Sequence, residues 1–145
     1  MKIIIIFFIS IISCSSNDRA IAKSKYIQMN DLWEKNARIE DVKTVFGNKT
    51  TTVESGIIYT YPNSKFPEMA FFFDSSNKLR EQFVFLQESA LQDFKKTINC
   101  KWKEIEEIKN IAHYQRTIKK GSCPELNITY QTYIDLNAYE LRWKR

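Results

Sequence analysis

The chain has 145 residues, of which 43% are hydrophobic and 27% are charged, and its formal net charge is +5. The length and the hydrophobic content suit one folded domain with a core of its own. Its basic residues alternate with acidic ones, as in residues 101–104, and no DNA- or RNA-binding motif accompanies them, which argues against a nucleic acid partner. A modest basic surplus fits solubility and some attraction to anionic surfaces.

The first thirteen residues predict an export signal. Lys2 gives a positive start, residues 3–12 are almost entirely apolar, and the small residue Ser13 follows. An apolar run of about ten residues is too short to span a bilayer, which needs roughly twenty. A positive end, a short apolar segment and a small residue are typical of a secretory signal. We therefore expect residues 1–13 to be a signal peptide.

The end of this segment carries a motif. Ile11-Ile12-Ser13-Cys14 resembles the lipobox of bacterial lipoproteins, in which the cysteine is lipidated and becomes the mature N-terminus. The resemblance implies that acyl chains such as palmitate anchor Cys14 to a membrane, and two or more chains hold a protein there stably. By the sorting rule of many Gram-negative lipoproteins, Ser15 implies the outer membrane, with the domain facing the periplasm. A plain secretory signal is the alternative.

The chain has three cysteines, and an anchor at Cys14 leaves Cys100 and Cys123 as a pair. In an oxidising periplasm two such thiols usually form a disulfide. A zinc site would need four ligands at short spacing, and the chain has one histidine, His113. A redox pair would more typically be Cys-x-x-Cys. The sequence therefore predicts a structural disulfide and no metal or other cofactor.

The segment after the anchor is first polar and then periodic. Residues 15–28 show no sustained periodicity, so we predict a flexible tether over residues 14–28. A helix is expected to begin at Asp31 or Arg38 and to end at Phe46, before Gly47. Residues 50–61 then read as a strand with a bulge or bend at residues 55–56.

The middle of the chain predicts a hairpin and a second helix. Residues 68–74 and 79–87 are expected to be strands about a four-residue loop, with Asp74 bonding backbone N–H groups of the turn. Phe83 and Phe85 are expected to share a face with Phe71. A helix capped by Ser89 is expected to run to Ile98.

The last third predicts strands. Residues 101–110 fit either a helix or a strand, residues 113–119 a strand, and residues 120–122 a turn. Residues 126–134 and 139–144 alternate between apolar and polar side chains, which predicts an antiparallel hairpin with one buried and one wet face.

These elements indicate an α+β fold: an antiparallel sheet with two helices packed on one face, in the order helix, strands, helix, strands. We predict one domain over residues 29–145, and its two cycles of elements suggest halves at residues 29–87 and 88–145. No residue repeat supports a duplication.

The first of these halves carries a pattern at the end of the predicted helix, in the first strand and around the hairpin: Val42, Phe46, Gly47, Ile58, Tyr59, Phe71, Phe73, Asp74 and Leu79. This pattern resembles that of the SmpA/OmlA (BamE-like) family of small outer-membrane lipoproteins. The chain departs from the family pattern at Asn36, at residues 48–49 and at Asn77. The resemblance implies an accessory role in outer-membrane assembly or integrity through protein contacts.

A catalytic constellation is not evident in the sequence. Nucleophilic catalysis needs a base beside the nucleophile, and His113 sits next to a tyrosine in a predicted strand. The carboxylates at Glu104, Glu106 and Glu107 form a run rather than a converging pair, which is typical of a solvated face. We therefore expect a non-enzyme.

With no catalytic residues and no nucleic-acid motif in the sequence, we expect the protein to function by binding. An exposed aromatic patch on a sheet often anchors a protein partner, and Tyr61 and Tyr133 are the aromatic candidates. We expect a non-catalytic module for an envelope protein partner, with an envelope hydrolase as one alternative. The other alternative is a basic domain that binds anionic lipid or cell-wall polymer through Lys119, Lys120, Arg142, Lys144 and Arg145.

Overall fold

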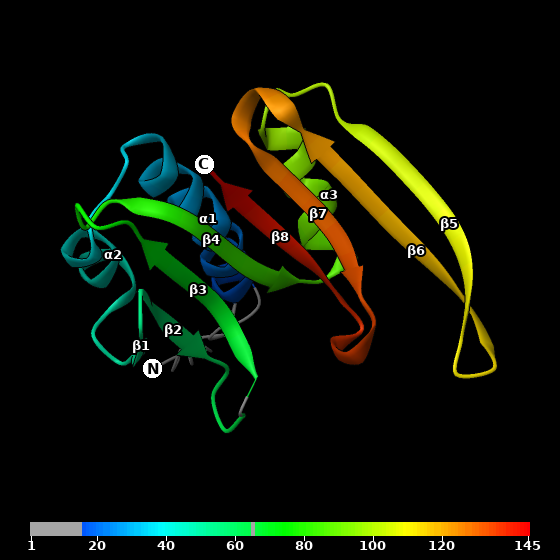
Figure 1. The fold of residues 1–145 in the computed structure, drawn as a ribbon, viewed down its shortest axis with the longest axis horizontal. Coiled ribbons are helices and arrows are strands. Elements are labelled where there is room, and N and C mark those ends of the chain that lie inside the picture. The colour runs from blue at the N-terminus through cyan, green and yellow to red at the C-terminus, as the bar shows by residue number, and fades with distance from the viewer. Residues whose placement is uncertain (1–15, 65) are drawn as a thin grey trace, which may run out of the picture.

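The computed structural model of the protein describes residues 16–64 and 66–145. Eight strands form one antiparallel sheet in the order β1-β2-β3-β4-β8-β7-β6-β5, accompanied by three α-helices (Figure 1). The helices are α1 (Ser16–Glu34), α2 (Ile39–Phe46) and α3 (Glu88–Thr97). The strands are β1 (Thr51–Val53), β2 (Gly56–Thr60), β3 (Pro67–Phe73), β4 (Leu79–Leu86), β5 (Lys103–Ile111), β6 (Tyr114–Cys123), β7 (Ile128–Tyr133) and β8 (Ala138–Lys144), with short 3₁₀ helices η1 (Pro124–Leu126) and η2 (Ile134–Leu136) beside β7.

The expected fold class is wrong in its helices and in its order of elements. The sequence predicts an α+β fold with two helices on one face, whereas the described chain has three helices and an eight-stranded sheet that dominates the structure. Two helices precede the first strand, and α1 covers most of residues 14–28, where we predict a tether. Tyr26 is buried on this helix, so its segment belongs to the folded domain.

One row of side chains runs across six strands and defines the buried face of the sheet. The strand register places these residues directly opposite one another, and each is at most 1% exposed. Because directly opposed residues project to the same side, the row forms the centre of the core beneath the helices. Its members are Ile57, Phe71, Gln82, Trp143, Ile128 and Cys123.

Helix α1 is held on this face by two buried hydrogen bonds. The Gln82 side chain on β4 donates to the Met29 carbonyl at 2.9 Å, and Trp143 Nε1 on β8 donates to Asn30 Oδ1 at 3.2 Å. Buried polar groups are costly unless they are paired, so these bonds fix where α1 crosses the two central strands.

The other two helices contact the same face through aromatic rings. On α3, Phe94 packs against Trp143 with ring centroids 5.6 Å apart. On α2, Phe46 packs against Phe71 at 5.6 Å, and the Tyr59 hydroxyl donates to the Gly47 carbonyl at 2.7 Å. Residue 47 has a φ of 89°, a left-handed conformation that glycine adopts without strain. The predicted end of this helix is therefore confirmed.

A β-bulge turns two phenylalanines away from the core. Phe73 pairs with Leu79 and Phe72 pairs with Glu81, so Arg80 is an additional residue on β4. One extra residue reverses the alternation of every side chain that follows. Phe83 therefore lies opposite Ala70 rather than with Phe71, and the expectation that Phe83 and Phe85 join the buried face is wrong.

Three further predictions are corrected or decided by the strands. Residues 50–61 form two strands, β1 and β2, which pair with each other, so the expected bend is a chain reversal. Residues 101–110, which fit two alternatives, belong mostly to β5. Residues 120–122 continue β6 instead of turning, because they pair with both β5 and β7.

Several local predictions are confirmed. Asp74 Oδ1 accepts hydrogen bonds from the backbone N–H groups of Ser76 at 2.8 Å and Lys78 at 3.0 Å, as expected for the turn between β3 and β4. Cys100 and Cys123 form a disulfide with their Cα atoms 6.0 Å apart. It ties the segment after α3 to the end of β6.

No helix of the described residues is long and apolar enough to cross a membrane.

The C-terminal residue serves the fold. The Arg145 guanidinium lies over the Trp33 ring at 4.2 Å and donates to the Leu79 carbonyl at 2.8 Å and to the Trp33 carbonyl. It thereby joins the end of the chain to α1 and to the start of β4.

We expect Arg145→Ala to lower the free energy of unfolding by about 1–2 kcal/mol, because it removes charge-assisted hydrogen bonds and a cation–π contact. Urea unfolding of the purified domain measures the loss. Lys144→Ala, one residue earlier and exposed, is the control and should change stability by less than about 0.5 kcal/mol. Equal stability of the two variants would contradict this role for Arg145.

Candidate functional site

The sheet face opposite the helices carries four aromatic rings in succession. Phe72 and Phe83 have ring centroids 6.2 Å apart, Phe83 and Phe85 5.4 Å, and Phe85 and Tyr133 4.8 Å. Phe85 is buried beneath its neighbours, and the other three are partly exposed. We call these four residues the aromatic row, and the side of the sheet that bears them the open face.

Arg142 fixes the middle of the aromatic row. Its guanidinium lies 4.9 Å from the centre of the Phe83 ring, while Nε donates to Glu140 at 2.6 Å and Nη1 donates to Glu81. Two carboxylates thus neutralise the cation and hold it over the ring. The arrangement gives the open face a rigid centre in which a planar cation and an aromatic ring are partners.

A shallow groove of about 480 Å³ continues from Arg142 toward β5. Lys103 and Lys120 line it together with Thr129, Gln131 and Ile105. The register explains this grouping, because Lys103, Ser122, Thr129 and Arg142 lie opposite one another across four strands. The lining carries three cations and one carboxylate, Glu140, so the groove attracts anionic groups.

The two predicted aromatic residues meet at Phe85. Tyr133 packs on its ring, and the Tyr61 hydroxyl donates to its backbone carbonyl at 3.1 Å. Tyr61 is 36% exposed. The structure therefore brings together two residues that are far apart in the sequence, around a phenylalanine that the sequence places on the wrong face.

The five predicted basic residues do not form one patch. Lys120, Arg142 and Lys144 lie on the open face, as the register shows. Lys119 lies on the other face, where its ammonium pairs with Glu88 at 3.7 Å. Arg145 is bound to α1 and β4 as described above. The five residues therefore lie on two faces of the sheet and at the C-terminal contact, and they do not form a single basic surface.

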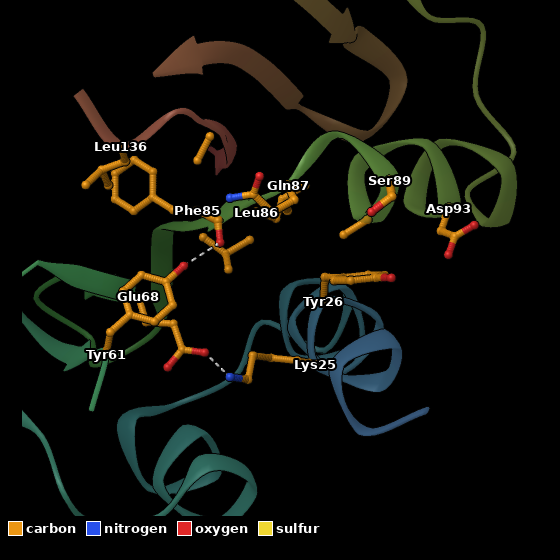
Figure 2. Close-up of a pocket in the computed structure, with 13 residues that line it drawn as sticks. Lys25, Tyr26, Tyr61, Glu68, Phe85, Leu86, Gln87, Ser89, Asp93 and Leu136 are labelled. Carbon is orange, nitrogen blue, oxygen red and sulfur yellow. Dashed lines mark hydrogen bonds and ion pairs between the residues drawn. The ribbon is translucent and has the colours of Figure 1, made fainter. Parts of the chain in front are cut away.

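A larger pocket of about 910 Å³ lies where α1, α3 and the end of β4 meet (Figure 2). Lys25 and Glu68 form an ion pair at one side, and the Tyr61 hydroxyl donates to Phe85 within it. Figure 2 shows Glu68 and Asp93 on opposite sides of this pocket. The two carboxylates therefore do not converge as acid and base on one bond.

The tyrosines of this pocket are held neutral. Burial raises the pKa of Tyr26, and Asp93 raises it further. Burial and the charge of Glu68 likewise raise the pKa of Tyr61. The pocket thus presents neutral rings, apolar side chains such as Leu86 and Leu136, and an ion pair that is already formed. These groups suit an apolar side chain better than a reacting polar group.

The other ionisable residues considered as candidates either have hydrogen-bond partners within the fold or lie exposed. Glu104 accepts hydrogen bonds from Lys95 and from the Tyr130 hydroxyl, the latter at 3.0 Å, and these bonds lower its pKa. Burial and a hydrogen bond to Glu88 raise the pKa of Tyr139 to about 12. His113 lies exposed in the turn between β5 and β6. Among the described residues, these groups form no pair of nucleophile and base.

Sequence reasoning missed Phe83, Phe85 and Lys103 as residues of the candidate site. Uninterrupted alternation from Leu79 assigns the two phenylalanines to the buried face, and the bulge at Arg80 places them on the open face instead. Lys103 lies in the segment whose secondary structure the pattern left undecided. Cys14, the predicted lipidation site, lies outside the described residues.

Comparisons with known proteins provide no relative for this chain. No family model, no curated protein and no solved structure matches it.

Proposed function

We propose that the protein is a lipid-anchored module of the bacterial cell envelope, which binds a protein partner on the open face of its sheet. The observation that carries the proposal is the aromatic row, held in place by Arg142 beside the groove with Lys103 and Lys120. Partly exposed aromatic rings and arginine are the groups most enriched at the centres of protein interfaces. The matching partner surface has apolar side chains for the row and an acidic group for the two lysines.

The basic-domain alternative is weaker because most of its cations are already paired. Glu81 and Glu140 neutralise Arg142, Glu88 pairs with Lys119, and Arg145 binds backbone carbonyls. Binding to a polyanion needs cations that are free to exchange small counterions. A hydrolase is also less well supported, since Lys25 and Glu68 pair with each other in the large pocket and the Tyr61 hydroxyl donates to a backbone carbonyl.

The envelope location rests on the lipobox at Cys14 and on the disulfide. Disulfides persist in oxidising compartments such as the periplasm, and this chain has one between Cys100 and Cys123. The resemblance of the first half to SmpA/OmlA lipoproteins adds an accessory role in outer-membrane assembly or integrity to the proposal. The outer membrane, with the domain in the periplasm, is the proposed location.

Replacing the anchor should release the protein. We expect Cys14→Ser to move the chain from the membrane fraction to the soluble envelope fraction, because acylation would no longer be possible. Fractionation and intact mass of both forms measure this. A variant that stays membrane-bound and has the same added mass as the original would contradict lipidation at Cys14.

The binding proposal is tested by crosslinking in bacterial cells, affinity purification and mass spectrometry. We expect the full chain to recover an envelope protein, and Phe83→Asp to reduce its yield at least tenfold, as for an interface hot spot. Val45→Asp is the matched control, because Val45 is an exposed apolar residue on α2. Equal recovery with both variants would contradict the open face as the binding site. Salt-sensitive retention on lipid or cell-wall preparations, without a protein partner, would support the polyanion alternative instead.

A further inference from the structure

The strand β5 is the outer edge of the sheet, and all nine of its residues are exposed. With β6 it forms a hairpin that extends away from the helices (Figure 1). Ile105, Ile108 and Ile111 on this strand are 59%, 71% and 38% exposed. An exposed edge with large apolar side chains is a template for pairing with another strand.

The hairpin turn determines which backbone groups of β5 are available. Ile111 pairs with Tyr114 around Ala112 and His113, whose φ angles are 48° and 68°. Such a two-residue turn is closed by a hydrogen-bonded pair, and hydrogen-bonded pairs alternate along an antiparallel ladder. The N–H and C=O groups that point to the free edge therefore belong to the even-numbered residues, with Ile108 near the middle.

We propose that β5 pairs with β5 of a second copy of this chain, antiparallel and about a two-fold axis at Ile108. In this register Ile108 lies opposite Ile108 of the other copy, and Ile105 lies opposite Ile111. Glu107 lies opposite Lys109, and the two-fold axis repeats this contact. Opposed apolar pairs and opposite-charge pairs both stabilise antiparallel strands.

Registers centred on Glu106, Glu107 or Lys109 bring like charges together, and one centred on Asn110 sets Ile111 against Lys109 instead of an isoleucine. An axis at Glu107 places this carboxylate opposite itself, and an axis at Lys109 does the same for the ammonium. An axis at Glu106 opposes the two copies of Glu106 and also sets Lys103 against Lys109. Charges on an edge strand normally oppose pairing, but the register centred on Ile108 sets Glu107 against Lys109 and opposes no like charges.

The intrachain ion pair agrees with this arrangement. Lys109 Nζ lies 3.2 Å from Glu107 Oε2 on the same strand. In the paired state the two glutamates and two lysines would form one network of alternating charge across the axis. The proposal depends only on β5 and goes beyond the binding function proposed for the open face.

Disulfide trapping of the full chain in bacterial membranes tests the pairing. Opposed residues of a hydrogen-bonded pair have Cα atoms about 5.5 Å apart, which a disulfide can bridge. We expect Ile108→Cys to give a covalent dimer on mild oxidation. Thr117→Cys is the control, since Thr117 is exposed and pairs with Ile108 on the inner strand β6. If the thiol introduced by Ile108→Cys reacts with maleimide but forms no more dimer than the control, the proposal is overturned.

Charge exchange tests the register in the same assay. In the Ile108→Cys background, Glu107→Lys and Lys109→Glu should each reduce the dimer yield several-fold, because every cross-axis contact becomes a like-charge pair. Coexpression of these two variants, carrying different mass tags, should restore a mixed dimer, because their strands are then complementary. Failure of the mixed dimer to exceed the two single variants would overturn the register at Ile108, whether or not the open face binds a partner.

Discussion

Trp143→Ala should lower the free energy of unfolding by about 3–5 kcal/mol, the range for removal of a large buried aromatic side chain. Trp143 is fully buried at the centre of the row beneath the helices, contacts Phe94 and donates to Asn30. The substitution leaves a cavity between α1, α3 and β8 and an unpaired oxygen on Asn30. For a domain of ordinary stability, such a loss approaches complete unfolding.

Two further variants separate the contributions to this effect. Trp143→Phe keeps an aromatic ring but removes the N–H donor, so we expect a smaller loss of about 1–3 kcal/mol. Ile105→Ala is the control, because Ile105 is 59% exposed and should change stability by no more than about 0.5 kcal/mol. Urea unfolding followed by circular dichroism measures all three. A loss below about 1 kcal/mol for Trp143→Ala would contradict the packing described here.

Removal of the disulfide should cost about 3 kcal/mol, because the link closes a loop between positions that are 23 residues apart. Cys123 is fully buried, so alanine is the appropriate replacement there, and serine suits the more exposed Cys100. Without the link, the segment after α3 loses its covalent tie to the end of β6, and β5 begins at the end of that segment.

The measurement compares denaturant unfolding of the original chain, with and without reductant, to that of the Cys100→Ser and Cys123→Ala double variant. We expect reductant to lower the midpoint of the original chain to that of the double variant and to leave the double variant unchanged. A double variant as stable as the oxidised chain would show that the link does not stabilise the fold.

Local sequence patterns predict the structure correctly where one physical signal dominates. The hairpin of β7 and β8 follows from strict alternation, and α2 follows from apolar spacing and the glycine at its end. The disulfide between Cys100 and Cys123 is predicted from cysteine parity and an expected oxidising compartment. Each of these predictions depends on residues close in the chain or on a count.

The predictions that proved wrong concern features that tertiary structure determines. The buried stripe of α1 includes Tyr26 and the polar residue Asn30, whose side-chain oxygen accepts a hydrogen bond from Trp143, far along the chain. The bulge at Arg80 depends on the pairing of β4 with β3. The alternation of apolar and polar residues along β4 does not reveal the bulge. The groove with Lys103 exists because β5, β6, β7 and β8 are neighbours in the sheet, an order that no local pattern specifies.

We propose that a protein partner occupies the open face. A photoreactive amino acid in place of Thr129, an exposed residue of the groove on β7, tests it most directly in living cells. We predict an ultraviolet-dependent adduct with an envelope protein at this position and none at Thr44, an exposed position on α2. An adduct of equal yield at Thr44, or no protein adduct at Thr129 in cells where the chain is correctly anchored, would contradict the claim.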